Sequence, residues 1–321
     1  MILNGRSMLR PKRDSMIHTE DLSKQFGDFW AVDGVDLDVQ PGQVLALLGQ
    51  NGAGKTTTVR MLTSVLVPTR GTATVGGYDV VKQPDRVRAV VGILTEQHGL
   101  YLRMTGIEYL DFYGRIYRLD STARQRRSQE LMEYFGLADA NHQRIGEYSK
   151  GMRQKLALAR TLIHEPPVLL LDEPTSAMDP ESARLVRDSI ASLRSGNRAI
   201  IICTHNLVEA ELLADQVAII YHGRILIKGS VAELKKRLLG PSEFEIQVRG
   251  GWRGGAFDLP GVELVAETES GPRYRINDPE TANPVLLRQL IGRGVEVISM
   301  QEVPRTIEQV YLAAMAQVKD G

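Results

Sequence analysis

Residues 43–58 read Gln-Val-Leu-Ala-Leu-Leu-Gly-Gln-Asn-Gly-Ala-Gly-Lys-Thr-Thr-Thr, and this stretch decides the fold. The apolar run near its start predicts a buried strand, and the segment that begins at Lys55 predicts a helix. Between them, Gly49, Gly52 and Gly54 permit backbone conformations that a β-carbon would obstruct. The spacing Gly-x4-Gly-Lys-Thr between a strand and a helix is the pattern of a phosphate-binding loop.

A loop of this kind recognises phosphate through its backbone and two side chains. Backbone N–H groups surround the phosphates, and the helix N-terminus adds roughly half a positive charge. We expect Lys55 to bridge the β- and γ-phosphates and the Thr56 hydroxyl to bind Mg²⁺. The alternative is a glycine-rich turn that precedes Lys-Thr by chance, and the strand–loop–helix context argues against it. The residues predicted to bind the nucleotide here are Gly49, Asn51, Gly52, Ala53, Gly54, Lys55, Thr56 and Thr57.

The composition excludes several classes of protein. A chain of 321 residues is long enough for two domains, and its 39 basic residues balance 39 acidic ones. The balance gives no indication of a nucleic-acid surface, so no nucleic-acid partner is expected. No apolar run approaches the roughly 18 residues of a spanning helix. Cys203 is the single cysteine, which excludes an intrachain disulfide, and its apolar neighbours predict a small buried strand residue.

The first 15 residues carry Arg6, Arg10, Lys12 and Arg13 without the apolar core of a signal peptide. We predict a disordered basic tail over residues 1–15. Patterning typical of folded structure begins near Met16, which is an alternative start.

Beyond the loop, the chain alternates buried strands with amphipathic helices, which predicts a largely parallel α/β sheet. Residues 16–48 favour strands joined by turns, and residues from about 97 to 150 favour helices. Another buried strand ends in Asp172-Glu173. Asp179-Pro180 then predicts a helix start, with Asp179 as the N-cap and proline in the first turn.

Composition changes at Gly240-Pro241, so we predict domains over residues 16–240 and 241–321. The second is a small α+β domain that begins with an alternating strand near Phe244. Asn283-Pro284 predicts a helix start, and Thr306 with Gln309 fits a capping box that opens a final helix.

Two acidic residues and one histidine follow the predicted parallel strands. Asp172 lies where a phosphate-loop ATPase binds Mg²⁺, and Glu173 where such an enzyme orients or deprotonates the attacking water. By itself, an Asp-Glu pair at a strand end is more often a solvated turn. Its place on a second apolar strand after the phosphate loop favours catalysis. His205 follows the next strand, where an isolated histidine is usually a hydrogen-bonding residue.

The stretch Tyr148-Ser149-Lys150-Gly151-Met152 is similar to the Leu-Ser-Gly-Gly-Gln signature of the ABC transporter ATPases. Other elements of that family follow the same order over roughly residues 16–235, which makes the resemblance specific. These elements are the adenine-stacking aromatic Phe26, the Walker A loop at 49–56, the Walker B end Asp172-Glu173, the D-loop Ser176-Ala177-Met178-Asp179, and the switch His205.

The resemblance implies a P-loop NTPase core of the ABC ATPase type, with an antiparallel β subdomain and a helical subdomain. It also implies that two ATPase subunits close head to tail, as a homodimer or paired with a similar subunit. ATP then lies between one Walker A loop and the other subunit's signature, so Ser149 and Gly151 contact the γ-phosphate in trans, with Asp179 nearby. Glu173, His205 and Lys55 carry hydrolysis in this scheme.

The sequence departs from the family at two places. Where the family usually has glutamine, after the predicted strand near residue 92, this chain has Glu96, with Gln97 one position later. The resemblance gives Glu96 a role in sensing Mg²⁺ or water. Lys150 and Met152 replace glycine and glutamine of the signature, which resembles the exporter branch of antibiotic-resistance and sodium-efflux ATPases.

The expected function is therefore that of an ATP-hydrolysing exporter subunit, with ATP and Mg²⁺ as cofactors. Its expected partners are polytopic membrane permease subunits, which place it at the cytoplasmic face of the cell membrane. A soluble, non-transport ABC ATPase and an importer ATPase are the alternatives.

Overall fold

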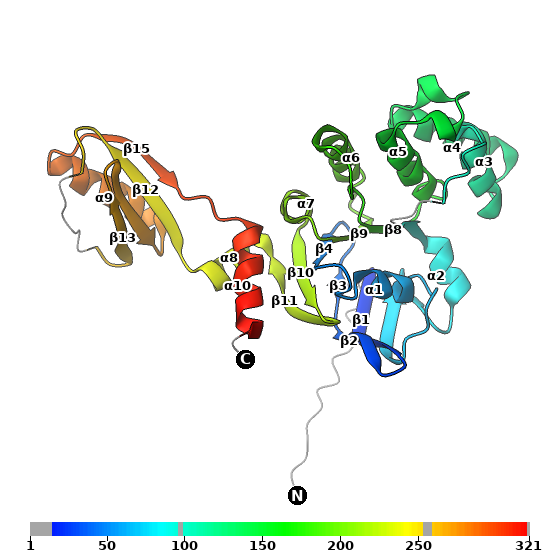
Figure 1. Ribbon diagram of the computed structural model, residues 1–321, viewed down its shortest axis with the longest axis horizontal. Coiled ribbons are helices and arrows are strands. Elements are labelled where there is room, and N and C mark those ends of the chain that lie inside the picture. The colour runs from blue at the N-terminus through cyan, green and yellow to red at the C-terminus, as the bar shows by residue number, and fades with distance from the viewer. Residues whose placement is uncertain (1–14, 96–98, 253–258, 320–321) are drawn as a thin grey trace, which may run out of the picture. The chain divides into compact units, whose positions relative to one another are not determined.

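The computed structural model describes residues 15–95, 99–252 and 259–319. Contacts divide the chain into two units, with the boundary between Ser230 and Val231 (Figure 1). The composition change at Gly240-Pro241 lies later in the chain. No helix in the described part of the chain combines the length and the apolar composition needed to cross a bilayer.

The N-terminal unit contains an antiparallel sheet, in which β2, β1, β5 and β6 lie in that order and β3 also pairs with β1. Its strands are β1 (Ile17–Phe26), β2 (Phe29–Val35), β3 (Asp38–Val39), β5 (Arg70–Val75) and β6 (Tyr78–Asp79). The turn between β1 and β2 passes through Gly27, whose φ of 55° lies in the left-handed region that glycine adopts readily. This turn places Phe26 and Phe29 at one end of the sheet, as cross-strand partners.

The second sheet of this unit has the order β11-β10-β4-β9-β8-β7. Its strands from β10 to β7 are parallel, and β11 is antiparallel to β10. The strands are β4 (Val44–Leu48), β7 (Val91–Leu94), β8 (Val168–Asp172), β9 (Ala199–Thr204), β10 (Gln216–Tyr221) and β11 (Arg224–Ser230). Every residue of β4, β8 and β9 is buried, because layers cover both faces of the sheet. The predicted parallel α/β core is therefore confirmed.

Four helices connect or flank these strands: α1 (Lys55–Leu62), α2 (Pro84–Val90), α6 (Pro180–Ser192) and α7 (Leu207–Leu213). The predicted start of α6 is confirmed, since the Asp179 side chain accepts a hydrogen bond from the Ser182 amide at 2.9 Å. Since the carboxyl ends of parallel strands share one edge, the loops after β4, β8 and β9 lie together.

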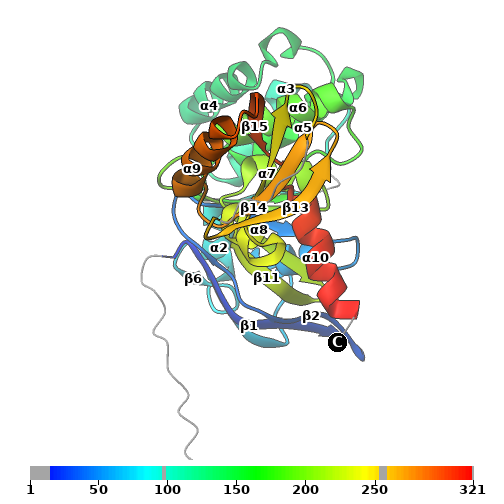
Figure 2. The same ribbon diagram turned by 90° about the vertical axis from the view of Figure 1, so that its left-hand side faces the viewer.

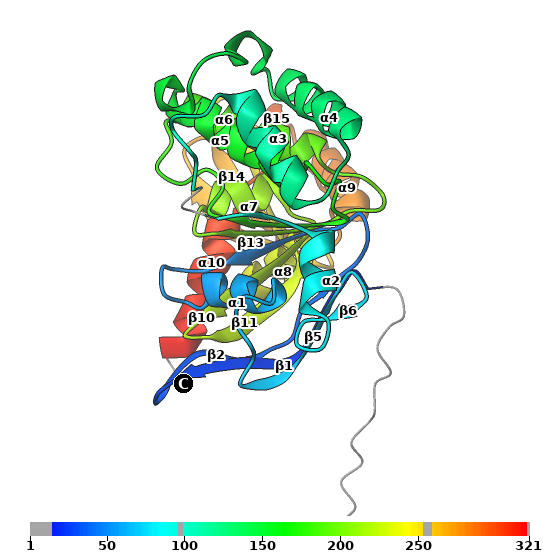
Figure 3. The same ribbon diagram turned by 90° about the vertical axis from the view of Figure 1, so that its right-hand side faces the viewer.

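A helical part of the same unit contains α3 (Gly106–Ile116), α4 (Ser121–Tyr134), α5 (Lys150–Thr161) and two short 3₁₀ turns, Ala138–Ala140 and Ile145–Glu147. Figure 3 shows α3, α4 and α5 gathered at one end of the unit. A capping box opens α3, in which Thr105 and Glu108 satisfy each other's backbone amides. Tyr109 of α3, Met132 of α4 and Leu156 of α5 belong to one buried cluster.

The C-terminal unit has an antiparallel sheet of order β13-β14-β12-β15. Its elements are α8 (Val231–Leu239), β12 (Ser242–Val248), β13 (Val262–Thr268), β14 (Gly271–Ile276), α9 (Pro279–Gly292), β15 (Val297–Glu302) and α10 (Ile307–Lys319). Helix α9 covers one face of the sheet (Figure 2), where Ile246 and Tyr274 form a buried cluster with Leu286 and Leu290. Helix α8 contacts α10.

One helix start in this unit differs from the prediction. Helix α9 begins at Pro279, and the Asn283-Pro284 pair lies inside it. Pro279 fits the first turn, where an amide has no intrahelical partner, so the helix begins there in spite of the second proline. The predicted capping box of α10 is confirmed, because the Gln309 amide donates to Thr306 Oγ1 at 3.4 Å and Gln309 Oε1 accepts from the Thr306 amide at 3.1 Å.

Candidate functional site

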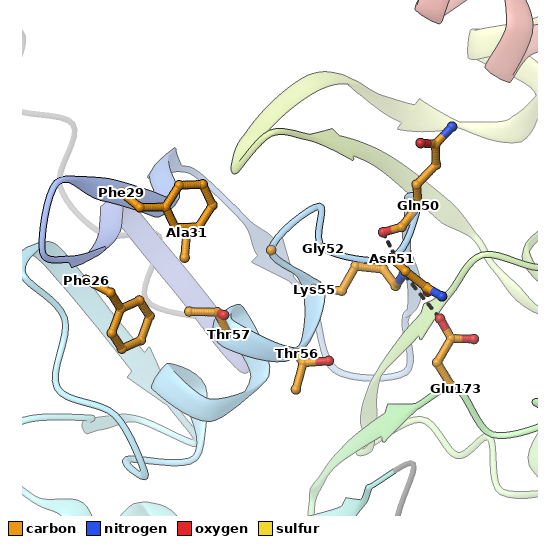
Figure 4. A pocket seen from close by; sticks show the side chains of 11 residues that line it. Phe26, Phe29, Ala31, Gln50, Asn51, Gly52, Lys55, Thr56, Thr57 and Glu173 are labelled. Atoms are coloured by element: carbon orange, nitrogen blue, oxygen red, sulfur yellow. Dashed lines mark hydrogen bonds and ion pairs between the residues drawn. The ribbon is translucent and has the colours of Figure 1, made fainter.

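A cavity of about 550 Å³ lies where the antiparallel sheet meets the loop after β4 (Figure 4). Phe26, Phe29 and Ala31 line one end, and Glu173 lies at the other, beyond the phosphate loop. The complete lining is Phe26, Phe29, Ala31, Gln50, Asn51, Gly52, Gly54, Lys55, Thr56, Thr57 and Glu173. The cavity therefore combines exposed aromatic rings with the predicted phosphate-binding backbone.

The loop needs glycine at two of its positions for steric reasons. A β-carbon at Gly49 would collide with the Ile220 carbonyl oxygen, and one at Gly54 would lie 2.6 Å from the Ala31 carbonyl oxygen. Gly54 also has φ 111°, in the region that other residues avoid. Helix α1 follows with no side-chain cap and no acidic residue in its first turn. Its N-terminal amides therefore have no side-chain cap that an anion would have to displace.

Lys55 joins the loop to the residues after β8. Its Nζ donates to the Gly49 and Gln50 carbonyl oxygens at 2.7 and 3.2 Å and lies 3.1 Å from Glu173 Oε1. The side chain is 5% exposed, so this ion pair is partly shielded from solvent. The phosphate loop and the acidic strand end, more than a hundred residues apart in sequence, are therefore in direct contact.

A second contact joins the same two elements. The Thr56 hydroxyl donates to Asp172 Oδ2 at 2.8 Å, and Asp172 is buried at the end of β8. A hydroxyl and a carboxylate are hard oxygen ligands, and Mg²⁺ is usually held by one or two protein ligands together with phosphates and water. The pair Thr56 and Asp172 therefore fits a Mg²⁺ ion that the nucleotide also binds.

His205 completes this cluster. Its Nδ1 lies 2.8 Å from Glu173 Oε2, so Glu173 has Lys55 on one oxygen and His205 on the other. The His205 side chain is 52% exposed, whereas that of Glu173 is 10% exposed. Glu173 also has φ 50°, and its amide donates to the Cys203 carbonyl oxygen at 2.8 Å, which ties the turn to β9. Burial raises the pKa of the Cys203 thiol, as expected for a buried strand residue.

The signature residues lie elsewhere. Ser149 is the N-cap of α5, and its Oγ accepts from the Met152 amide at 3.2 Å. Neither Ser149 nor Gly151 lines the cavity formed by the phosphate loop of the same chain. Lys150 Nζ donates to the Ala177 carbonyl oxygen, and a β-carbon on Gly151 would lie 3.3 Å from Ser182 Oγ. The start of α5 therefore adjoins the D-loop segment.

Asp179 is also outside that cavity, at the start of α6. Hydrogen bonds to the backbone and side chain of Ser182 hold the pKa of the Asp179 carboxyl below its usual value. Its observed role in the single chain is to cap this helix. Glu96, predicted as a metal-sensing residue, lies outside the described residues.

The sequence analysis did not identify Phe29, Ala31 and Gln50 as lining residues. Phe29 is 62% exposed and begins the strand that follows the tight turn. Its closeness in sequence to Phe26, the ring predicted to stack on the adenine, was a signal that could have identified it as a lining residue. Ala31 and Gln50 carry no such indication, since their positions depend on how the two sheets meet.

Comparison with known proteins agrees with this geometry. A model of the ABC transporter family matches residues 32–176, and the C-terminal domain of ATP-binding proteins of the DrrA1-3 type matches residues 229–315. The chain is 36% identical over 303 residues to the "Daunorubicin resistance ATP-binding protein DrrA3" of Streptomyces coeruleorubidus, covering 93% of this chain and 95% of the relative. It is 41% identical over 224 residues to the "ABC transporter ATP-binding protein NatA" of Bacillus subtilis (strain 168), covering 68% of this chain and 91% of that relative.

A solved structure described as "Structure of ATP binding subunit of ABC transporter" superposes with a TM-score of 0.64 at 27% identity. The superposition covers 70% of this chain and 94% of the solved chain. The chain is therefore an ATP-binding, ATP-hydrolysing subunit of the ABC transporter family, in the exporter branch that carries a DrrA-like C-terminal domain.

Proposed function

We propose that two copies of this chain close head to tail around two Mg-ATP molecules and thereby drive export through separate polytopic permease subunits. The chain would act at the cytoplasmic face of the membrane. The observation that carries the proposal is the division of the predicted site. Lys55, Thr56, Asp172, Glu173 and His205 contact one another at the phosphate loop, whereas Ser149 and Gly151 lie outside that cavity. A second copy can supply what the first lacks.

Nucleotide binding follows from the shape of the cavity. Phe26, which is 48% exposed, offers an aromatic face to the adenine, and Phe29 lies beside the same end. The amides at the start of α1, which no side chain caps, would then face the phosphates. Lys55 exchanges part of its interaction with Glu173 for the more strongly charged phosphates.

The metal and the catalytic acid occupy neighbouring positions. Thr56 and Asp172 would hold Mg²⁺, which neutralises phosphate charge when bound. Glu173 would orient the attacking water and accept its proton, while His205 holds the second oxygen of the Glu173 carboxylate in place. Lys55 and His205 would thus orient the Glu173 carboxylate through its two oxygens.

The trans contacts use the free end of α5. Because Ser149 Oγ accepts from the Met152 amide, its own hydrogen remains available to a γ-phosphate oxygen of the partner's nucleotide. The Gly151 amide and the N-terminal end of α5 add to the same anion site, and Asp179 would lie near the dimer interface. Closing a mostly open dimer requires about 5.5 kcal/mol of differential binding, which two shared nucleotides are well placed to supply.

Disulfide cross-linking tests the head-to-tail arrangement. Cys203 is the only cysteine and is buried, so Asn51→Cys combined with Ser149→Cys introduces the only accessible pair. Mild oxidation with ATP should give a covalent dimer, and each single variant should not. A product cross-linked only within one chain, or an equal yield from Ser149→Cys alone, would contradict the arrangement.

The membrane partner is tested by purification from a native membrane. A polytopic membrane protein should co-purify with the tagged chain, and a salt wash should not reduce the amount recovered. Recovery of ribosomes without a membrane protein would instead favour a soluble ABC ATPase.

A further inference from the structure

Glu209 is a buried acid that the mechanism above does not use. It lies on α7, its side chain is fully buried, and the residues buried beside it on the helix, Ala210 and Leu213, are apolar. Burying a carboxyl group costs free energy unless hydrogen bonds compensate it. An aliphatic residue would fill this position at a lower cost, so the contacts of Glu209 must explain the acid.

The side chain of Glu209 leads to the Glu173 turn, and its amide leads to the His205 loop. Thr175 Oγ1 donates to Glu209 Oε1 at 3.1 Å, and Thr175 belongs to the turn that carries Glu173. Burial raises the pKa of the Glu209 carboxyl, and the nearby hydroxyls of Thr204 and Thr175 offset part of the rise. The charge of Glu173 raises the pKa of Glu209 further, whereas that of Arg187 lowers it.

Thr204 is the last residue of β9 and directly precedes His205. The Thr204 carbonyl oxygen accepts from the Gly49 amide at 3.2 Å, which connects the same strand end to the phosphate loop. Asn206 then caps α7 by accepting from the amides of Val208 and Glu209 at 3.1 and 3.2 Å. Glu209 thus sits one helical turn after His205, on a helix whose start is fixed to the His205 loop.

We infer that Glu209 is a positioning residue that ties the β9 end carrying His205 to the turn carrying Glu173. Its side chain accepts from the buried Thr175, and its amide donates to Asn206, which directly follows His205. Glu209 thereby holds the two segments at the separation that gives the 2.8 Å contact between His205 and Glu173. The inference rests on the proposed catalytic roles of Glu173 and His205. A neutral side chain that accepts the hydrogen bond from Thr175 satisfies this role as well as the acid.

Steady-state ATP hydrolysis by the purified full chain, with its membrane partner where that is required, tests the inference. Glu209→Leu keeps a similar volume but loses the bridge, so kcat should fall by about 10- to 100-fold while KM for Mg-ATP stays within about threefold. Glu209→Gln keeps a neutral hydrogen-bonding group and should retain kcat within about threefold. Leu212→Ala, on the same helix but 66% exposed, is the matched control and should behave like the parent chain.

Thr175→Val removes the hydrogen bond from the other side and serves as a second variant if Glu209→Leu does not fold. It should lower kcat several-fold, again without a matching change in KM. An unchanged kcat in Glu209→Leu or in Thr175→Val would overturn the inference, as would an equal loss in Glu209→Gln and Glu209→Leu. A Glu173→Gln chain that hydrolyses ATP normally would instead refute the proposed function.

Discussion

Two of the sheets in this chain, the six-stranded sheet and the C-terminal one, are built on opposite principles. In the six-stranded sheet, β4, β8 and β9 are buried throughout, and the polar groups of the site lie at the strand ends and in the loops that follow them. In the C-terminal sheet, β12 alternates buried Phe244, Ile246 and Val248 with half-buried or exposed polar residues. The first design concentrates reactive groups at one edge, whereas the second spreads charge over a face.

That charged face of the C-terminal sheet is ordered by strand register. Glu243 and Glu263 are both cross-strand partners of Arg275, which lies 2.9 Å from Glu243 and 3.1 Å from Glu263. Exposed pairs of this kind contribute little to stability, because water screens them. The comparison therefore predicts that substitutions at the strand ends of the first sheet affect chemistry, and that substitutions in the second sheet affect mainly its own folding.

The largest effect is expected at Lys55. Lys55→Ala removes the ammonium that contacts the loop carbonyl groups and Glu173, so ATP hydrolysis should fall by at least about 100-fold. Lys82→Ala, in which the lost lysine is 81% exposed, is the matched control. Phosphate release from both variants is the measurement. If Lys55→Ala hydrolysed ATP at a rate within a few-fold of the parent chain, the chemistry would not lie at the carboxyl ends of the parallel strands.

A core substitution in the C-terminal unit should separate stability from chemistry. Leu290→Ala leaves a cavity beneath the sheet and should lower the free energy of unfolding of that unit by about 2–5 kcal/mol. Basal ATP hydrolysis should persist below the new unfolding transition. Urea unfolding measures the stability, and the hydrolysis assay measures the activity. Arg275→Ala should change neither the free energy of unfolding nor the rate of hydrolysis measurably. Loss of hydrolysis in fully folded Leu290→Ala would show that the two units are not separable in function.

How much of the site and of the fold could be predicted from the sequence depends on where each residue lies. Asp172, Glu173 and His205 were identified because each follows an apolar strand, and parallel strands bring their ends together. Glu209 was not identified, since a glutamate on a short helix resembles a solvated residue until its neighbours are known. The start of α9 was placed wrongly at Asn283-Pro284, because Pro279 occupies the first turn and Pro284 lies inside the helix.

A smaller, pH-dependent effect is expected at His164 in the N-terminal unit. Its ring stacks on Tyr117 with centroids 3.7 Å apart, and burial lowers the pKa of His164 to about 4. Because the unfolded chain binds this proton more readily, the stability that neutral His164 provides is present above about pH 6.5 and is lost as pH falls toward 4.

Since part of the ring remains accessible to water, we expect a loss of about 1 kcal/mol by pH 5. His164→Gln should reduce the slope of unfolding free energy against pH between these values. Urea denaturation at several pH values measures the slope. An identical slope in parent and variant would mean that His164 binds its proton equally well in the folded and the unfolded chain, which contradicts the lowered pKa.

The central claim is that one copy grips ATP with its phosphate loop and the other with its signature helix. Glu173→Gln tests it most directly, because the amide no longer accepts the proton of water while Lys55 and Thr56 still bind phosphate. Light scattering should give the mass of a dimer when this variant holds Mg-ATP and of a monomer when ADP replaces it. A Glu173→Gln chain that remains monomeric in Mg-ATP, with its permease present, would contradict the account.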